Sequence, residues 1–422
     1  MRVLFVTLPE KSHLFCMTPI AWAVRAAGHE VRVASSPAFT DVIARTGMTA
    51  VGVGDDSNIS AAMAQHRESQ EVESVDWSEL DPAKLTWERE LERAQMGAWG
   101  FAYYNEPMIA DLVAFARHWR PDLVVWDPLT YAGPLAAGAV GAAHVRSMCF
   151  ADVWAMKRQL FTKLRDEVPQ QQREDPMADW LGGHAEALGG TFTEELITGQ
   201  LTLDPLPERL SVPSDVRRVP VRFVPYNGPA VVPDWLAEPA ARPRVCLSLG
   251  AANTERYGGD YVSKAAVLEA LSDLDVEVVA ALLPAQVQEL DRVPDNARVV
   301  QSVPLHALLP SCAALIHHGG FGSYATALVH GVPQLFVSTP VADQTLRATG
   351  LQEAGAGLFL PHVQAGPQQI RDAVSRLVSE PGFAGNAATL RDEALRRPAP
   401  AQVVAELERF TAEQRPAAWR RP

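Results

Sequence analysis

The feature that most constrains the fold is a short apolar run that leads directly into a glycine-rich loop. Residues Ala313 to Ile316 predict a buried strand, and the run HHGGFGS follows at residues 317–323. A helix is expected over Tyr324 to His330, where Gly331 ends it. Glycines let the backbone approach a ligand, and the amides at a helix start attract anions. We therefore predict a phosphate-binding site at the carboxyl end of a parallel strand.

Composition limits the kind of protein that carries this loop. With 422 residues the chain exceeds one compact core, so two domains of about 200 residues each are expected. The net charge of −13 argues against a nucleic-acid partner held through phosphate contacts. Four cysteines without a CxxC pair predict neither a metal cluster nor disulfides, and they favour a reducing cytoplasm. Neither a signal peptide nor the run of about 20 apolar residues that a membrane span needs is visible.

The first residues predict the opening unit of a doubly wound α/β domain. Val3 to Thr7 is an apolar run typical of buried parallel strands, and Glu30 to Ala34 predicts the next strand. Between them we expect a loop over Leu8 to Met17 and then a helix. The helix is expected to start at Thr18-Pro19, with threonine as the N-cap and proline at the first position. This alternation is typical of a parallel sheet covered by helices.

Aromatic residues spread through residues 55 to 110, which we interpret as a polar, irregular insertion. They are Trp77, Trp87, Trp99, Phe101, Tyr103 and Tyr104. Such residues either form a small satellite core or line an apolar pocket, and the sequence leaves both interpretations open. A helix from Asp111 to Trp119 is expected to follow.

A second α/β domain is expected after a cluster of prolines. The prolines lie between Leu203 and Arg244, where their density precludes long helices and indicates a linker. Strands are then expected at Val245–Leu249, Val276–Leu282, Val299–Val300, Ala313–Ile316 and Gln334–Val337. The amphipathic segment Ala401 to Thr411 predicts a final helix that packs back on the N-terminal domain. The expected boundaries are 1–203, a linker 204–244, 245–398, and a C-terminal helix and tail 399–422.

The glycine loop alone allows more than one interpretation. Gly320-x-Gly322-x-x-Ala325 formally satisfies the dinucleotide fingerprint, and Asp343 lies near the place of a ribose-binding acid. Two features argue against a nicotinamide-dependent oxidoreductase: the motif comes late in the chain, and two histidines fill the strand-to-loop junction. A tight turn that only packs is disfavoured, because ligands bind at the carboxyl ends of strands in parallel sheets.

Residues 302–344 as a whole resemble the donor-nucleotide signature of inverting nucleotide-sugar glycosyltransferases with the GT-B fold. The match comprises Pro304, LLP at 308–310, HHGGxGS at 317–323, GVPQ at 331–334 and Asp343-Gln344. Over nearly the whole chain, the sequence is similar to antibiotic glycosyltransferases of the macrolide and anthracycline deoxysugar branch. Runs typical of that branch are KSHL at 11–14, AAGHEV at 26–31, WDPLT at 126–130, REDP at 173–176 and YNGP at 226–229. The resemblance implies two Rossmann-like α/β domains facing a central cleft, with the acceptor in the first domain and a TDP-sugar in the second.

By position, the resemblance assigns donor binding to residues of the second domain. His318, Gly322 and Ser323 would hold the diphosphate, helped by the loop after Gly250. Val303 would meet the base, while Asp343 and Gln344 would meet sugar hydroxyls. The implied donor set is Gly250, Val303, His318, Gly319, Gly320, Gly322, Ser323, Thr326, Asp343 and Gln344.

Thr326 bears on the identity of the nucleotide. In relatives that use UDP-sugars, a glutamate at this position grips both ribose hydroxyls. A carboxylate has less use when the 2′-hydroxyl is missing, so Thr326 favours TDP. On a deoxygenated sugar, some bonds from Asp343 and Gln344 would have no partner. The asparagine that often follows this pair is absent, since the sequence there is Leu346-Arg347-Ala348.

His13 is the candidate catalytic base. It is expected in the first strand-to-helix loop, where the positive end of the following helix disfavours imidazolium. Inverting transfer needs a base that takes the proton of the acceptor hydroxyl as that hydroxyl attacks the anomeric carbon. Asp127 follows the apolar strand Leu123 to Trp126 and could bond the other ring nitrogen, which would fix the tautomer. Asp127 could equally cap the following helix, and the sequence leaves both roles open.

The resemblance therefore implies a hexosyltransferase that moves a deoxysugar from TDP to a polyketide aglycone. Asp273-Leu274-Asp275 spells the D-x-D of metal-dependent transferases, but it precedes a strand, so we interpret it as a loop. No metal or other cofactor is expected, because the phosphate loop would stabilise the leaving group. A cytochrome-monooxygenase-like auxiliary protein is an implied partner, and a homodimer stays open. The alternatives are an NAD(P)-dependent oxidoreductase, a GT-B epimerase and a non-catalytic sugar-nucleotide-binding module.

Overall fold

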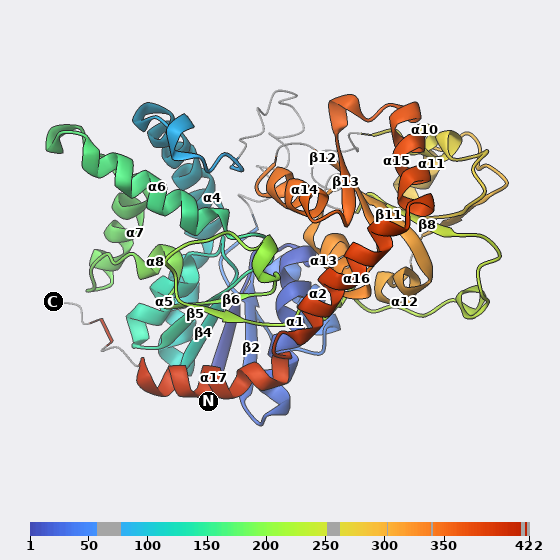
Figure 1. The fold of residues 1–422 in the computed structure, drawn as a ribbon. Coiled ribbons are helices and arrows are strands. Elements are labelled where there is room, and N and C mark those ends of the chain that lie inside the picture. The colour runs from blue at the N-terminus through green and yellow to red at the C-terminus, as the bar shows by residue number, and fades with distance from the viewer. Residues whose placement is uncertain (57–76, 251–261, 302, 339–340, 415–417, 420–422) are drawn as a thin grey trace.

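Two α/β domains make up the molecule (Figure 1). The computed structural model describes residues 1–56, 77–250, 262–301, 303–338, 341–414 and 418–419. Each domain contains a parallel sheet flanked by helices, as the sequence predicts for a doubly wound fold.

The N-terminal sheet has, within the described residues, the strand order β3-β2-β1-β4-β5-β6-β7, and every pairing is parallel. Its strands are Arg2–Val6 (β1), Glu30–Ser35 (β2), Ala50–Gly52 (β3), Leu123–Trp126 (β4), Ala143–Ser147 (β5), Leu201–Asp204 (β6) and Arg218–Pro220 (β7). Strand β7 lies inside the segment predicted to be a linker. It pairs with β6 through Thr202 and Arg218, so part of that segment belongs to the N-terminal sheet. Three residues that end in proline are too short a pattern to predict a strand.

The C-terminal sheet repeats this topology. Its described strands have the order β10-β9-β8-β11-β12-β13, again all parallel. They are Arg244–Ser248 (β8), Glu277–Ala281 (β9), Ala297–Val300 (β10), Cys312–His317 (β11), Gln334–Ser338 (β12) and Gly357–Pro361 (β13). In both sheets the strand order reverses next to the first strand of the domain. Ligands bind outside the carboxyl ends of strands at such a switch point.

Helices surround the two sheets. In the N-terminal domain they are Lys11–Ala26 (α1), Thr40–Arg45 (α2), Trp87–Trp119 (α4), Ala132–Val140 (α5), Val153–Glu167 (α6), Pro176–Ala187 (α7) and Glu195–Thr198 (α8). The following helices are Lys264–Ala270 (α10), Pro284–Gln288 (α11), Leu305–Leu308 (α12), Phe321–His330 (α13), Gln344–Glu353 (α14), Pro367–Ser379 (α15), Pro381–Arg396 (α16) and Pro400–Glu413 (α17).

Helix α1 begins earlier than the sequence predicts. It starts at Lys11, and Pro19, expected at the first helical position, lies in its interior. A proline inside a helix costs about 3 kcal/mol because it removes one hydrogen bond and clashes with the preceding turn. Burial of Leu14, Met17 and Ile20 on one face of α1 offsets that cost. His13 therefore lies in the first turn of a helix rather than in a loop.

Helix α4 replaces much of the predicted irregular insertion. It runs from Trp87 to Trp119, and the hydroxyl of Thr86 accepts a hydrogen bond from the Arg89 amide at its start. Glycines and a proline within this stretch weaken the helical pattern in the sequence. Packing of the second half of α4 against α5 decides the conformation instead. Residues 57–76 of the insertion lie outside the described residues.

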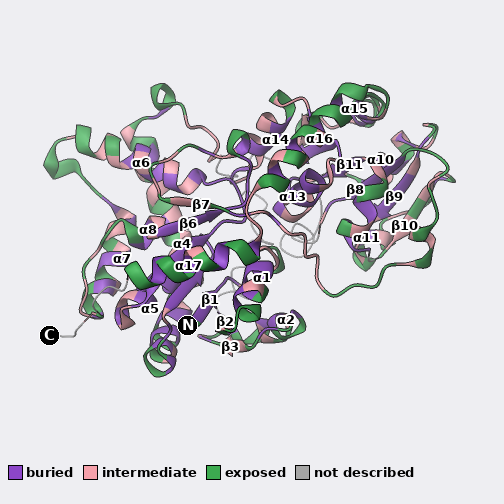
Figure 2. Ribbon diagram, turned by 60° about the horizontal axis from the view of Figure 1, so that its bottom comes forward, coloured by how far each residue is buried: buried purple, intermediate pink, exposed green. Residues whose placement is uncertain are grey.

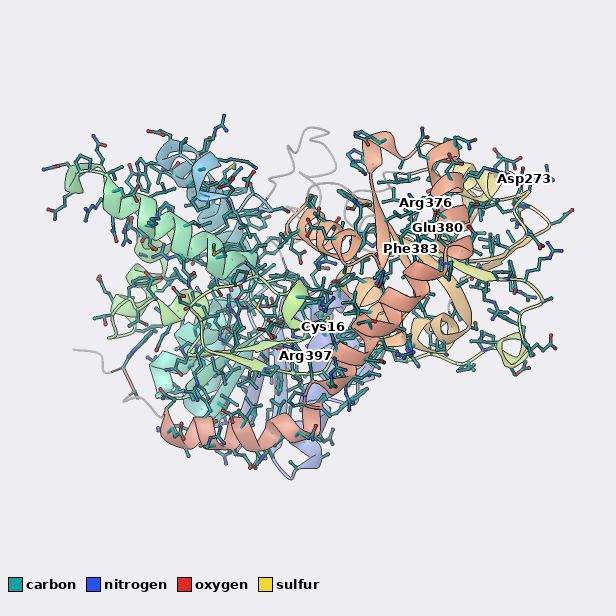
Figure 3. The ribbon with its side chains drawn as sticks, viewed as in Figure 1. Cys16, Asp273, Arg376, Glu380, Phe383 and Arg397 are labelled. Atoms are coloured by element: carbon teal, nitrogen blue, oxygen red, sulfur yellow. The ribbon has the colours of Figure 1, made fainter. Side chains whose placement is uncertain are left out.

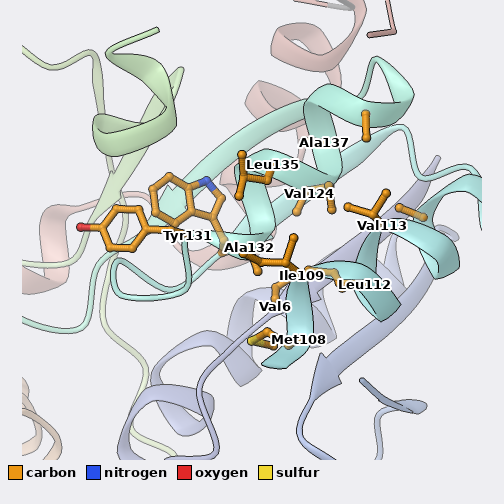
Figure 4. Packing of buried hydrophobic residues seen from close by; sticks show 14 of the residues in the cluster. Val6, Met108, Ile109, Leu112, Val113, Val124, Tyr131, Ala132, Leu135 and Ala137 are labelled. Carbon is orange, nitrogen blue, oxygen red and sulfur yellow. The ribbon is translucent and has the colours of Figure 1, made fainter. Parts of the chain in front are cut away.

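The core of the N-terminal domain lies between the sheet and these helices. Figure 4 shows Val6 of β1 and Val124 of β4 close to Ile109, Leu112 and Val113 of α4, in one cluster of buried residues. Residues Ala132, Leu135 and Ala137 of α5 complete the layer. In both domains the central strands are buried, the edge strands β3, β7, β10 and β13 are largely half-buried, and the outer faces of the helices are exposed (Figure 2). The sheets are thus rigid supports for the loops at their carboxyl ends.

The end of the chain returns to the N-terminal domain. Helix α17 contacts α1, and Val403, Leu407 and Phe410 join the N-terminal core (Figure 1). Beyond it, the Trp419 amide donates to the Gly138 carbonyl at 3.1 Å. None of the described helices combines the length and the apolar character that crossing a bilayer requires.

Candidate active site

A cavity of about 520 Å³ lies between the carboxyl ends of the two sheets. Its wall combines residues that follow β1, β4 and β5 with residues that follow β8, β11 and β12. The sequence-predicted residues on this wall are His13, Gly250, His318, Gly319, Gly320, Gly322, Ser323, Asp343 and Gln344. The structure therefore brings the candidate base and most of the candidate donor residues to one site, although the chain separates them widely.

On the N-terminal side, His13 and Asp127 are in direct contact. Nδ1 of His13 lies 3.2 Å from Oδ1 of Asp127. The first turn of α1 carries the histidine, and the loop after β4 carries the aspartate. Because Nδ1 contacts the carboxylate, a neutral ring keeps its proton there and leaves Nε2 to accept another. The side chain of His13 is 13% exposed, and it lines the cavity.

Asp127 is fully buried, and several groups hold it. Its carboxylate accepts hydrogen bonds from the amides of Leu8 (2.8 Å) and Leu129 (2.9 Å) and from the Thr130 hydroxyl (2.5 Å). Burial alone would raise its pKa, but the charge of His13 and these bonds outweigh burial, so the pKa lies below its ordinary value. Asp127 thus contacts His13 and organises the turn before α5 through Leu129 and Thr130. It does not cap that helix, whose N-cap position is Tyr131 and carries no side-chain cap bond.

Cys149 and Phe150, in the loop between β5 and α6, complete the surroundings of His13. Sγ of Cys149 lies 3.5 Å from Nδ1 of His13. The ring of Phe150 meets the imidazole edge-on, with 6.3 Å between the ring centroids. Burial raises the pKa of the Cys149 thiol well above its ordinary value, so the thiol stays protonated and does not compete as a base. The sequence does not single out either residue, since only the fold brings this loop to His13.

On the C-terminal side, the glycine loop joins β11 to α13. Helix α13 begins at Phe321, so the amides of Phe321, Gly322 and Ser323 have no partner within the helix. Amides at a helix start are suited to binding an anion. A Cβ atom on Gly322 would meet nothing within 4 Å, which leaves room for a ligand there. The geometry therefore agrees with a phosphate cradle.

Glycines next to His318 let its ring lie against the backbone. A Cβ atom added to Gly250 would lie 2.4 Å from Nε2 of His318, and one on Gly320 would lie 2.9 Å away. Gly250 also has φ +70°, a conformation that favours glycine. The predicted help from the loop after Gly250 lies outside the described residues, because that loop is 251–261.

Two predicted donor residues do not face the cavity. Thr326 is fully buried within α13, and its hydroxyl donates to the Gly322 carbonyl at 2.6 Å. Val303 is buried beside Leu305 and Leu308. The cavity wall includes neither side chain. A threonine in a helix readily donates to the carbonyl one turn back. At the position that the resemblance assigns to a glutamate in UDP-sugar enzymes, this chain therefore has a hydroxyl whose proton is already used in a hydrogen bond within the helix.

Asp343 also differs from the sequence expectation, because its carboxylate is already occupied. It is 2% exposed and makes a two-pronged ion pair with Arg347, with Oδ2 2.6 Å from Nε and Oδ1 2.9 Å from Nη2. Oδ2 also accepts from the Ala151 amide at 2.6 Å. Gln344 remains next to the donor loop, since a Cβ on Gly319 would lie 2.9 Å from its Oε1. The sequence records Arg347 only as a departure from the usual asparagine, although its i,i+4 spacing from Asp343 predicts a pair within a helix.

The D-x-D run lies away from the cavity. Asp273 and Asp275 belong to the turn between α10 and β9, as expected. Asp273 pairs with Arg371, and Asp275 lies 3.5 Å from Arg242. Figure 3 shows Asp273 at the outer edge of the C-terminal domain, whereas Cys16 of the cavity wall lies at the centre of the molecule. Among the residues that the structure describes, no group of three or more side chains is arranged to hold a metal ion.

Comparison with protein families assigns both halves of the chain to one family. Residues 22–250 match the model described as "Erythromycin biosynthesis protein CIII-like, N-terminal domain". Residues 265–410 match the corresponding C-terminal domain.

Curated relatives and solved structures agree with this assignment. The 10-deoxymethynolide desosaminyltransferase of Streptomyces venezuelae is 46% identical, with 98% of each chain covered. The aclacinomycin-T 2-deoxy-L-fucose transferase of Streptomyces galilaeus is 45% identical over 98% of this chain and 97% of its own. The structure of glycosyltransferase VinC in complex with DTDP has a TM-score of 0.89 and 43% identity, over 98% of this chain and all of the VinC chain. This chain therefore belongs to the erythromycin biosynthesis protein CIII-like family of GT-B glycosyltransferases.

Proposed function

We propose that this enzyme transfers a deoxysugar from a TDP-sugar to a hydroxyl of a polyketide aglycone, with inversion at the anomeric carbon. One observation carries the proposal: His13, held by the buried Asp127, and the glycine loop line the same cavity from opposite domains. The names of the relatives, a desosaminyltransferase and a deoxyfucose transferase, support a deoxysugar donor. They give no support to the oxidoreductase alternative.

In the proposed reaction, each domain performs one half of the work. Nε2 of His13 takes the proton of the acceptor hydroxyl, and the oxygen attacks the anomeric carbon as its bond to the diphosphate breaks. Asp127 stabilises the imidazolium that forms. The amides at the start of α13 and the His318 side chain stabilise the negative charge on the departing TDP. These groups are sufficient for the chemistry without a metal or a further cofactor.

TDP is the proposed nucleotide, on two grounds. VinC, which is 43% identical, has a structure in complex with DTDP. In this chain, the helix position of a ribose-gripping glutamate is held by the buried Thr326. We propose residues 245–398 as the donor domain. Its candidate donor contacts are Gly250, His318, Gly319, Gly320, Gly322, Ser323 and Gln344, which line the cavity. Val303 and Thr326 lie outside the cavity wall, and the Asp343 carboxylate is paired with Arg347.

The proposed acceptor domain is 1–203, and its aromatic residues offer an apolar surface. Trp154 borders the cavity and also contacts Trp77 and Phe101, with ring centroids 4.4 Å and 5.5 Å away. Such a surface fits the hydrocarbon body of a polyketide. Within the same proposal, a cytochrome-monooxygenase-like auxiliary protein and a homodimer are candidate partners. The free cysteines fit a cytoplasmic enzyme.

The test is a screen of TDP-deoxysugars against macrolide and anthracycline aglycones, with and without an auxiliary protein, read by mass spectrometry. His13→Ala should lower turnover by on the order of 10²–10⁴-fold, the range of general base catalysis. His29→Ala is the matched control, because His29 also pairs with a carboxylate (Glu408, 2.8 Å) but does not line the cavity. Equal turnover by His13→Ala and wild type would refute the proposed base, and product without acceptor would indicate an epimerase.

A further inference from the structure

The contacts of Asp343 and Arg347 extend to both domains. Arg347, which is 4% exposed, donates through Nη2 to the Gly319 carbonyl at 2.8 Å. Its guanidinium also lies over the rings of Phe321 and Tyr324, 5.6 Å and 5.0 Å from their centroids. Arg347 therefore fixes both the peptide in the middle of the glycine loop and the first turn of α13. These are the parts that form the phosphate cradle.

Asp343 carries the contact across the cavity. Its Oδ2 accepts from Nε of Arg347 in its own domain and from the amide of Ala151 in the other domain. Each of these bonds measures 2.6 Å, slightly shorter than the roughly 2.7–2.9 Å of a charge-assisted N–H···O⁻ bond. One carboxylate therefore connects the donor loop with the β5–α6 loop of the N-terminal domain.

The β5–α6 loop is in turn held next to the candidate base. Cys149 and Phe150, immediately before Ala151, are the residues that contact His13. Asp152, immediately after it, is buried, caps α6 through the Ala155 amide and pairs with Arg146 of β5. Because Asp152 fixes the end of the loop that leads into α6, a displacement of Ala151 is expected to move Cys149 and Phe150, and with them their contacts on His13.

The backbone before Asp343 supports a constrained arrangement. Ala342 has φ +50°, and Arg120 is the other non-glycine residue with positive φ in the described part of the chain. A left-handed alanine costs about 1–2 kcal/mol, and such strain persists where surrounding contacts enforce it. Here the Ala342 carbonyl accepts from the Ser78 hydroxyl at 3.4 Å, a second link between the domains.

We propose that Asp343 and Arg347 form a clasp that couples the donor loop to the position of the catalytic base. Arg347 sets the donor loop through Gly319, and Asp343 transmits that position through Ala151 to Cys149, Phe150 and His13. Both are positioning residues, and their proposed role replaces the sugar contact that the sequence predicts for Asp343. The inference depends on the proposed function for its kinetic consequence, but the clasp itself is measurable in the free protein.

The first test is hydrogen exchange in the nucleotide-free enzyme. Asp343→Asn and Arg347→Lys keep the side-chain lengths nearly unchanged and disturb the two-pronged pair. Peptides covering residues 149–152 should exchange at least several-fold faster in both variants. The control is Arg376→Lys, because Arg376 makes an i,i+4 pair with Glu380 on the exposed surface of the C-terminal domain (Figure 3). Unchanged exchange at 149–152 in both clasp variants would overturn the proposal.

The second test separates donor binding from general stability. In Arg347→Lys the affinity for TDP should fall about tenfold or more, as loss of a charged hydrogen bond predicts, while thymidine binding stays within about twofold. Asp343→Asn should lower kcat more than it raises the donor KM, and it should shift the pH profile of kcat. Equal losses for TDP and thymidine with an unchanged pH profile would indicate a purely structural pair and contradict the clasp.

These outcomes are distinguishable from failure of the proposed function. If the wild type binds no TDP and turns over no TDP-sugar, the proposed function fails, whereas the exchange result still decides whether the clasp exists. If Arg347→Lys does not fold, Asp343→Asn decides alone, since its side chain keeps the volume and one oxygen of the original.

Discussion

The two domains share one topology but place opposite chemistry at the edges that face each other. Both sheets reverse their strand order next to their first strand, so both present a switch point to the cavity. At the N-terminal edge, His13 contacts a buried carboxylate that fixes its proton. At the C-terminal edge, glycines and the start of α13 form the proposed phosphate cradle. The fold therefore determines where a site lies, and the side chains determine what it does.

Each edge also buries a carboxylate that contacts a nitrogen-bearing side chain, His13 at one edge and Arg347 at the other. The two pairs differ in one property. The partner of Asp127 is a histidine, whose ring has one nitrogen at the carboxylate and a second nitrogen available to exchange a proton. The partner of Asp343 is an arginine, and Asp343 raises its pKa despite the opposing effect of burial. The first pair is suited to proton transfer, whereas the second is a permanent ion pair suited to holding position.

The largest predicted effect separates base from donor binding. Asp127→Asn should lower turnover by about 10²–10⁴-fold, because the amide no longer fixes the tautomer of His13 or stabilises its charged form. Affinity for TDP, measured by calorimetry, should stay within about twofold. Asp122→Asn is the control, since Asp122 lies at the opposite end of β4 and bonds the Arg2 amide. Full activity in Asp127→Asn would contradict the assignment of proton transfer to the N-terminal edge and of donor binding to the C-terminal edge.

The converse change acts on the donor edge. Gly250→Ala places a Cβ 2.4 Å from Nε2 of His318 in a left-handed conformation, so His318 must move. The strain of about 1–2 kcal/mol predicts a loss of TDP affinity of on the order of tenfold. Gly28→Ala is matched to it, because Gly28 has φ +91° but no atom near its Cβ. Gly28→Ala should lower stability without changing TDP affinity, and equal TDP affinities in the two variants would contradict the assigned role of Gly250.

Acid should destabilise the N-terminal domain through a histidine away from the site. Burial lowers the pKa of His144 to about 3 from an ordinary value of 6.5. The unfolded chain therefore binds a proton that the folded chain does not, and stability is lost as pH falls below about 6.5. Between pH 7 and 5 this loss is about 2 kcal/mol. His144→Leu should reduce that loss in urea titrations at the two pH values, and an unchanged difference would show that His144 is not responsible.

The smallest effect compares the two left-handed non-glycine residues. Arg120 ends α4 with φ 56°, a position where glycine is preferred. Arg120→Gly should raise stability by about 0.5–1 kcal/mol with unchanged turnover. Ala342→Gly should relieve similar strain but lower kcat, because it loosens the segment before Asp343. Thermal unfolding and initial rates measure both, and equal kcat in the two variants would argue that the strain at Ala342 has no part in the site.

The sequence predicts well wherever a pattern is local. The strand Leu123 to Trp126 has the predicted bounds, because a continuous apolar run specifies it. The start of α1 and most of α4 were predicted wrongly. In both, burial against neighbouring elements outweighs a proline or glycines that would break an isolated helix.

For the candidate site, the sequence alone pointed to the glycine loop, His13 and Asp127, since each lies after a strand of a parallel sheet, at the edge where ligands bind. Only the tertiary structure decided what these residues meet. In the folded chain the Thr326 hydroxyl bonds the Gly322 carbonyl within α13. The Asp343 carboxylate pairs with Arg347 and accepts from the Ala151 amide, and Cys149 lies against His13. The reason is physical: strand ends follow from short-range hydrophobic patterns, whereas a buried ion pair or a contact between loops depends on packing between segments far apart in the chain.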